Sequence, residues 1–294
     1  MEMKEQPFDT GVVTLNYAEG PATGSPLVLL HGGNARWQSF DAVLPELSKK
    51  WHLYIPDLRG QGKSGRVPGR YRLQDYTDDV ITFLQKCVGK PAHVFGASLG
   101  GIIGLMVAAQ APHLVRSVVV GDSPLTAKTW LAATNQTRDK LASWQALAGG
   151  QFSIAEIIER LKDAPVEVSF QAPLVPMREA YGEDSPVYAW LADNLYQTDP
   201  DFFAALLDEP EITAKGYDME ILFPKIKCPV LLLQADPENG GALTDAEVVR
   251  GRHLLAQARH VRLEGISHIL FNDAHGKEPV LQAISEFLVS VEPR

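Results

Sequence analysis

The sequence predicts an α/β protein in which a mostly parallel β-sheet is flanked by helices and carries a helical insertion. Three observations predict this fold class. Short apolar runs alternate with helical patterns through the first 122 residues, and the same alternation returns after residue 224. The runs are continuous in Val, Ile and Leu, which is typical of parallel strands buried on both faces. Between the two regions lies a long segment without strand-like runs.

The apolar runs give the expected strands, and the periodic segments between them give the expected helices. In the first region we expect strands at 12–17, 27–30, 53–56, 93–95 and 117–120, with helices at 40–49, 74–88 and 99–111. In the last region we expect strands at 230–234 and 261–263, each followed by a helix, at 245–258 and 276–291. Helices between successive strands are the crossover connections that a parallel sheet requires.

The middle segment predicts a helical cap inserted between the sixth and seventh strands. It runs from 124 to 224, with helical patterns at 153–161, 187–196 and 200–207. It holds half of the aromatic residues of the chain, although the remainder is nearly twice as long. We therefore expect residues 1–123 and 225–294 to form one core domain that is interrupted by a cap at 124–224.

Composition excludes several classes of protein. The 294 residues are 45% hydrophobic and 21% charged, which is typical of a soluble globular protein. The formal charge of -9 argues against a nucleic-acid partner or an anionic membrane surface. Cys87 and Cys228 make no disulfide framework, and the acidic start Met1–Thr10 does not resemble a signal peptide. We expect a cytoplasmic protein without a membrane span.

The strongest chemical signal is the segment 96–101, which reads GASLGG between an expected strand and an expected helix. A G-x-S-x-G pattern in this context is typical of a nucleophile elbow, a strained turn that exposes a serine hydroxyl. Ser98 is therefore the candidate nucleophile, at the carboxyl edge of the sheet. The amide groups at the start of the next helix point toward the same place.

With these residues in view, the chain resembles the α/β-hydrolase superfamily, as a capped, esterase-like serine hydrolase. His31-Gly32-Gly33 matches the oxyanion loop of the family, and residues 57–65 (DLRGQGKSG) match its segment after the fourth strand. The resemblance extends over nearly the whole chain. It implies the α/β-hydrolase fold, a Ser–His–acid triad, and an oxyanion hole made by the backbone N–H groups of Gly33 and Leu99.

His268 is the expected catalytic base, because it follows the last strand and completes the chain order of nucleophile, acid and histidine. The acid is open among three carboxylates. Asp236 ranks first because it follows the seventh strand almost directly, Glu238 ranks second, and Asp122 after the sixth strand ranks third. Each of the three is alternatively an ordinary loop carboxylate.

The predicted function is hydrolysis of a carboxylic ester or related acyl bond through an acyl-enzyme, with no cofactor and no metal. The partner is a small, apolar substrate. Trp130, Trp144 and Trp190 of the cap are candidates to line its pocket, or else they form the core of the cap itself. The alternatives are a C–C bond hydrolase, a cofactor-free haloperoxidase, and a noncatalytic or slow-turnover receptor for a small ligand.

Overall fold

The computed structural model describes residues 2–166, 174–271 and 277–292, and its main feature is one large β-sheet. Within these ranges the sheet has eight strands in the order β1-β2-β4-β3-β5-β6-β9-β10. The six strands from β4 to β10 are parallel, and β1 and β2 are antiparallel additions at one edge. Their bounds are β1 Lys4–Asp9, β2 Thr14–Glu19, β3 Ser25–Leu30, β4 Trp51–Pro56, β5 Ala92–Ala97, β6 Val115–Gly121, β9 Val230–Ala235 and β10 Ala258–Leu263.

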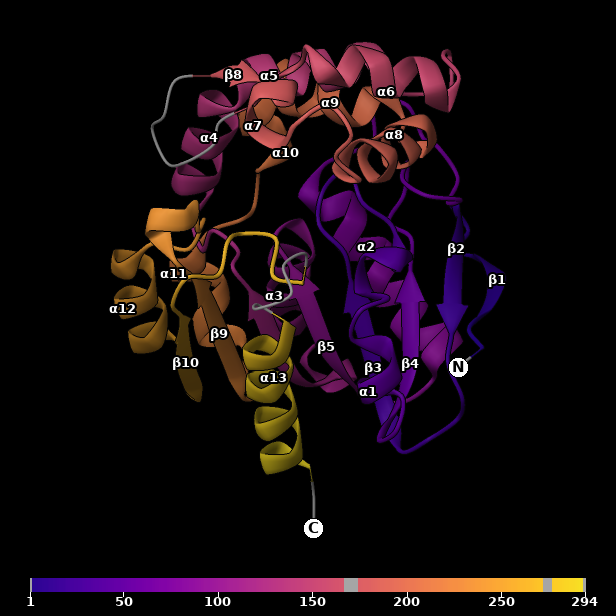
Figure 1. The fold of residues 1–294 in the computed structure, drawn as a ribbon. Coiled ribbons are helices and arrows are strands. Elements are labelled where there is room, and N and C mark those ends of the chain that lie inside the picture. Colours follow the sequence, from indigo (N-terminus) through magenta and orange to yellow (C-terminus); the bar gives the residue numbers. More distant parts are fainter. Residues whose placement is uncertain (1, 167–173, 272–276, 293–294) are drawn as a thin grey trace.

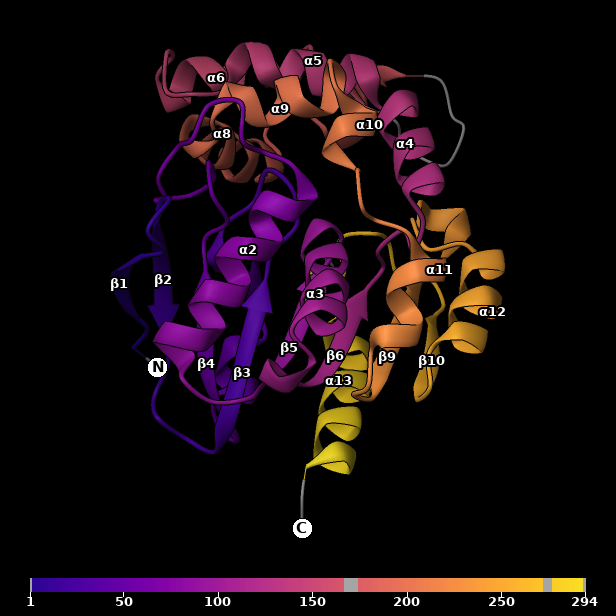
Figure 2. The same ribbon diagram turned by 180° about the vertical axis from the view of Figure 1, so that it is seen from behind.

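Helices cover both faces of the sheet, which explains why its central strands are apolar on both sides. In β3, Val28 and Leu30 pack toward one face, while Leu27 and Leu29 pack toward the other. The first face carries α2 (Leu73–Phe83), α3 (Leu99–Gln110), α11 (Met219–Leu222) and α12 (Asp245–Leu254). The second carries α1 (Leu44–Leu47) and α13 (Lys277–Val291). Figures 1 and 2 show the two faces in turn.

A helical insertion leaves the sheet after β6 and returns at β9, the sixth and seventh strands of the main sheet. Its helices lie across the end of the sheet where the parallel strands finish (Figure 1). They are α4 Ala127–Gln136, α5 Arg138–Leu147, α6 Ile154–Lys162, α7 Met177–Tyr181, α8 Val187–Gln197, α9 Pro200–Leu207 and α10 Pro210–Thr213. The expected cap boundaries of 124 and 224 stay a prediction, and part of that range lies outside the described residues.

Two expected helices differ from the structure, and one strand was not expected. The helix expected at 40–49 is only α1, because Pro45 lacks the N–H that an earlier turn would need. The helix expected at 245–258 ends at Leu254, and β10 begins at Ala258. Strand β1 was not expected at all. Both β1 and β10 are edge strands with polar, partly exposed side chains, so a search for continuous apolar runs misses β1 and finds only residues 261–263 of β10.

In the parts of the chain that the structure describes, no helix is long and apolar enough to cross a membrane. The helix expected at 276–291 is observed as α13, although Gly276 itself lies outside the described residues.

Candidate active site

Ser98 occupies a strained turn between β5 and α3, as the GASLGG segment predicts. Its backbone has φ of 52° and ψ of -117°, a conformation that few residues other than glycine adopt. The neighbouring glycines make this turn possible. A Cβ at Gly96 would lie 2.1 Å from the carbonyl oxygen of Gly100, and a Cβ at Gly100 would lie 2.1 Å from that of Leu30. The backbone N–H of Ser98 donates to Gly121 O at 2.9 Å, which ties the turn to the end of β6.

His268 lies between Ser98 and a buried carboxylate. Its Nε2 is 3.1 Å from Ser98 Oγ, and its Nδ1 is 2.7 Å from Asp122 Oδ2. Because a carboxylate oxygen can only accept, Nδ1 carries the proton of the neutral ring and Nε2 presents its lone pair to the serine. The three side chains therefore form a relay that begins at the serine hydroxyl and ends at the carboxylate.

Asp122 follows β6 directly and is fully buried. Besides His268, its carboxylate accepts backbone N–H groups from Ala235 at 3.0 Å, Ala242 at 2.7 Å and Leu243 at 3.2 Å. The residue has a φ of 44°, so the chain turns sharply at the strand end. These donors fix the carboxylate in the orientation that His268 needs.

The ranking of the three candidate acids was wrong, because the carboxylate beside His268 belongs to Asp122. Asp236, ranked first, accepts N–H groups from Gly265 at 2.9 Å and Glu238 at 3.0 Å, and the Asn239 amide at 3.3 Å. Glu238, ranked second, is exposed on the following turn. Neither carboxylate makes a described hydrogen bond with His268.

A local signal explains why Asp236 is used differently. It is the N-cap of the short turn Pro237–Asn239, with proline at the first turn position and Gly240 after it. Aspartate before proline is a typical start of such a turn. Its other contacts hold the segment that leads to His268, because the Asp236 N–H also donates to Ile266 O at 2.8 Å. The N–H groups of Gly265 and Glu238 lower the pKa of the Asp236 carboxyl.

The loop after β3 lies beside Ser98, as the oxyanion-loop resemblance predicts. A Cβ at Gly32 would lie 3.4 Å from Ser98 Cβ. His31 holds the base of this loop: its Nε2 accepts the N–H of Leu58 at 2.9 Å, so Nδ1 carries the proton and donates to Gly32 O at 2.7 Å. Complete burial lowers the pKa of His31, which keeps the ring neutral.

Segment 57–65 supports this loop rather than contributing a reactive group. Asp57 is buried and accepts the backbone N–H groups of Trp37 at 2.8 Å and Lys63 at 3.0 Å, which joins the loops after β3 and β4. Arg59 is buried and makes a bidentate ion pair with Asp79, at 2.6 Å and 2.8 Å. Asp57 and Arg59 are therefore both buried with hydrogen-bond partners, whereas Lys63 of the same motif is exposed and forms an ion pair with Glu5 at 2.7 Å.

The three tryptophans of the insertion have no described contact with Ser98 or His268, and their assignment to a substrate pocket stays a prediction. Trp130 is buried in α4, Trp190 is half-buried in α8, and Trp144 in α5 lies under the ammonium group of Lys140 at 5.3 Å.

Phe202 of α9 is the aromatic residue that reaches the β3 loop, and sequence reasoning did not single it out. A Cβ at Gly33 would lie 3.0 Å from its Cζ atom. The signal was weak because Phe202 is one of several aromatic residues in the insertion, and only the packing of α9 brings it to Gly33.

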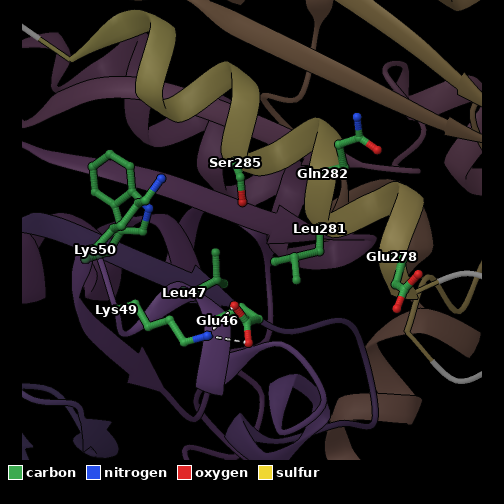
Figure 3. Close-up of a pocket in the computed structure, with 9 residues that line it drawn as sticks. Glu46, Leu47, Lys49, Lys50, Glu278, Leu281, Gln282 and Ser285 are labelled. Carbon is green, nitrogen blue, oxygen red and sulfur yellow. Dashed lines mark hydrogen bonds and ion pairs between the residues drawn. The ribbon is translucent and has the colours of Figure 1, made fainter.

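A surface pocket of about 340 Å³ lies elsewhere, between α1, the start of β4 and α13 (Figure 3). Its lining includes Leu47, Leu281 and the ion pair of Glu46 with Lys49 at 2.7 Å. Because Trp51 begins β4 and Ser98 follows the end of β5, the pocket is at the opposite end of the sheet from Ser98. Among the described residues, no group of three or more His, Cys, Asp or Glu could hold a metal ion.

Comparison with known proteins agrees with this geometry. Residues 25–162 match the family model for the alpha/beta hydrolase fold. A membrane phospholipase A of known structure superposes with a TM-score of 0.73 at 22% identity, covering 98% of this chain and 86% of its own.

Two curated relatives share shorter segments. The magnesium-chelatase 30 kDa subunit of Rhodobacter capsulatus is 38% identical over 32% of this chain. The 2-(acetamidomethylene)succinate hydrolase of Mesorhizobium japonicum is 32% identical over 39% of it. These matches span only 33% and 41% of the two relatives. The family match over residues 25–162, the topology of the sheet and the strained serine turn lead to one assignment: the chain has the α/β-hydrolase fold.

Proposed function

We propose that this protein is a serine hydrolase that cleaves a carboxylic ester, or a related acyl bond, of a small substrate through an acyl-enzyme. The observation that carries the proposal is the relay of Ser98, His268 and Asp122, with distances of 3.1 Å and 2.7 Å. Such a relay activates a hydroxyl that is otherwise a weak nucleophile.

The first half of the reaction forms the acyl-enzyme. Ser98 Oγ attacks the substrate carbonyl carbon while His268 Nε2 takes the hydroxyl proton. Asp122 stabilises the imidazolium that results and holds the ring in the required tautomer. The C–O bond to the leaving alcohol then breaks, and His268 returns the proton to the departing oxygen.

The second half releases the acid. Water attacks the acyl carbon, His268 takes its proton, and the bond to Ser98 Oγ breaks as that oxygen is reprotonated. In both halves the negative charge on the carbonyl oxygen is held by the N–H groups of Gly33 and Leu99. Leu99 begins α3, where the first amides have no acceptor within the helix. One such donor contributes about 3 kcal/mol in related enzymes.

The substrate group nearest the reacting carbon is apolar in this proposal. Phe202 supports this, because its ring packs on Gly33 and pairs with Phe203 at 5.1 Å, edge to face. An aromatic wall at this position favours an aliphatic or aromatic acyl group. Each methylene buried there adds about 0.8 kcal/mol of binding free energy. Activity is therefore expected to rise from acetate toward longer esters until the pocket is filled.

Covalent labelling and turnover test the proposal together. A fluorophosphonate should add once to the folded protein, peptide mapping should place it on Ser98, and p-nitrophenyl esters from acetate to octanoate should be hydrolysed. Ser98→Ala should abolish labelling and lower kcat about 10⁶-fold. Ser123→Ala is the matched control, since this nearby buried serine donates only to Gly121 O, at 3.3 Å.

The outcomes separate the alternatives. Labelling of Ser98 without turnover of any ester would favour a slow-turnover receptor, or a hydrolase for C–C bonds. The absence of labelling in the folded wild-type protein would contradict the nucleophile itself.

A further inference from the structure

The β3 loop, residues 31–36, is held from two sides. On its inner side it is attached to the core: His31 accepts the N–H of Leu58, and the N–H of Ala35 donates to the side-chain oxygen of Gln61 at 3.3 Å. Its outer side faces the helical insertion. The residues that carry the proposed oxyanion donor and its neighbours are on this outer side, so the insertion can set their position.

Three contacts join the outer side of the loop to α8, α9 and the turn between them. The ring of Phe202 packs on Gly33, and Asp193 forms an ion pair with Arg36. The hydroxyl of Thr198 lies 3.0 Å from Asn34 Oδ1 and 2.8 Å from Asn194 O, so its one proton is shared between these two acceptors. Asn34 and Thr198 are both buried. Three contacts from one short segment reach nearly successive residues of the loop.

Asn34 is the residue of this loop that most needs such support. Its φ is 52°, one of three positive values among the described residues other than glycine; the others are at Ser98 and Asp122. A conformation of this kind costs about 1–3 kcal/mol and persists only where neighbouring groups enforce it. Gly33, whose N–H is the proposed donor, directly precedes Asn34, so this turn adjoins the donor.

The turn that supplies Thr198 is itself anchored to the core. The next residue, Asp199, is buried and accepts a 2.5 Å hydrogen bond from the hydroxyl of Tyr71, and its N–H donates to Gly60 O at 2.7 Å. The other carboxylate oxygen of Asp199 caps the start of α9 by accepting from the N–H of Asp201 at 3.1 Å. These bonds fix the backbone next to Thr198, so its hydroxyl is held in place beside Asn34.

We propose that Thr198 is a positioning residue for the oxyanion hole. Its hydroxyl holds Asn34 in the strained turn, and Phe202 braces Gly33 beside it, so that the helical insertion directs the Gly33 N–H toward the developing oxyanion. Thr198 touches no reacting atom in this role. The inference rests on the proposed function, because it assigns the N–H of Gly33 to that hole.

Thr198→Val tests the hydroxyl at nearly constant shape. We expect kcat for p-nitrophenyl butyrate to fall about 10- to 100-fold with KM changed less than about threefold, since a misplaced donor affects the transition state more than the bound ester. The inhibition constant of an aryl trifluoromethyl ketone, whose hemiketal oxygen occupies the hole, should rise by the same factor. Thr198→Ser should restore kcat to within about threefold of wild type.

Thr134→Val is the matched control, because this threonine of the insertion is also buried and donates to Trp130 O in its own helix, and it makes no described hydrogen bond with the β3 loop. It should leave kcat and the inhibition constant unchanged. A Thr198→Val protein that loses thermal stability but keeps both values would overturn the proposal.

Hydrogen–deuterium exchange keeps the inference testable if the proposed function fails. Amides of a peptide that covers residues 32–36 should exchange faster in Thr198→Val than in wild type or Thr134→Val. Equal exchange in all three proteins would overturn the positioning role, whether or not any ester is turned over. Absence of both turnover and Ser98 labelling in wild type would instead contradict the proposed function.

A double-mutant cycle tests the Phe202 contact separately. Gly33→Ala should lower kcat, because the added Cβ would meet Phe202 Cζ at 3.0 Å. Phe202→Leu removes Cζ while keeping an apolar side chain, so Gly33→Ala should cost much less in that background. If the two effects multiply without coupling, α9 does not brace the loop.

Discussion

At the scale of single residues, Asp122 is the proposed catalytic acid, because its carboxylate lies 2.7 Å from His268 Nδ1, and Asp122→Asn tests this role. An asparagine can donate its N–H to His268 and so hold the imidazole in the wrong tautomer. We expect kcat to fall about 10⁴-fold, as in serine proteases that lose this carboxylate. The measurement is kcat and KM on a p-nitrophenyl ester, with circular dichroism to verify the fold.

Asp236→Asn is the matched comparison. The side chain keeps an oxygen to accept the N–H of Gly265 or Glu238, so we expect kcat within about tenfold of wild type. A larger loss in Asp236→Asn than in Asp122→Asn would restore the original ranking of the acids and contradict the geometry.

The proposed nucleophile and base could be located from the sequence because each has a local signature. Ser98 lies in a glycine pattern that only a tight turn requires, and His268 follows the last strand. The acid could not be placed, because its identity depends on which strand ends lie beside His268 in space. Even so, the Asp-Pro pair at 236–237 predicts a turn cap, and this argues locally against a triad role.

At the scale of secondary-structure elements, the turn at Ser98 and helix α3 form one unit. Two glycines of this helix test how tightly it packs against its neighbours. Gly100→Ala places a Cβ 2.1 Å from the carbonyl oxygen of Leu30, which precedes the loop beside Ser98. Gly104→Ala meets only the side chains of Val94 at 3.3 Å and Val118 at 3.5 Å. The carbonyl group of Leu30 is part of the backbone of β3. It therefore cannot move away from the added Cβ at residue 100 unless β3 itself moves.

We expect Gly100→Ala to lower the free energy of unfolding by about 3 kcal/mol or more, and to slow labelling of Ser98. Gly104→Ala should change that free energy by no more than about 1 kcal/mol, since its small overlap is offset by the higher helix propensity of alanine. Urea denaturation of both variants measures the difference. If Gly100→Ala lowered the free energy of unfolding no more than Gly104→Ala does, there would be space for an extra methyl group between α3 and β3.

Elements buried on both faces were predictable from apolar runs, as β3, β5, β6 and β9 show. The edge strand β1 was not, and of the edge strand β10 only residues 261–263 were, because one neighbour and partial exposure permit charged side chains in such strands. The contacts of Thr198 and Phe202 with the β3 loop were also beyond prediction. They join segments more than 150 residues apart in the sequence. The residue pattern of one segment does not indicate which distant segment will pack against it.

At the scale of the whole molecule, two histidines are completely buried within the described ranges, and these predict how stability depends on pH. Burial lowers the pKa of both His31 and His93. His31 is held neutral at the β3 loop. His93, in β5, contacts Ser117 Oγ at 2.7 Å and Glu292 Oε1 at 2.6 Å, so it joins the sheet to the C-terminal end of the described chain.

Below the ordinary histidine pKa of 6.5, the unfolded chain takes up protons that the folded protein does not. The unfolded state then binds more protons, so the stability that these two residues contribute is present above pH 6.5 and is lost as the pH falls toward their folded pKa values. Each histidine adds a slope of up to about 1.4 kcal/mol per pH unit in that window.

Urea denaturation between pH 5 and 8 measures the slope of the free energy of unfolding against pH. His93→Gln should reduce it, whereas His253→Gln, at an exposed position of α12, should leave it unchanged. A slope in His93→Gln equal to that of wild type would show that His93 gains its proton in the folded state as readily as in the unfolded chain.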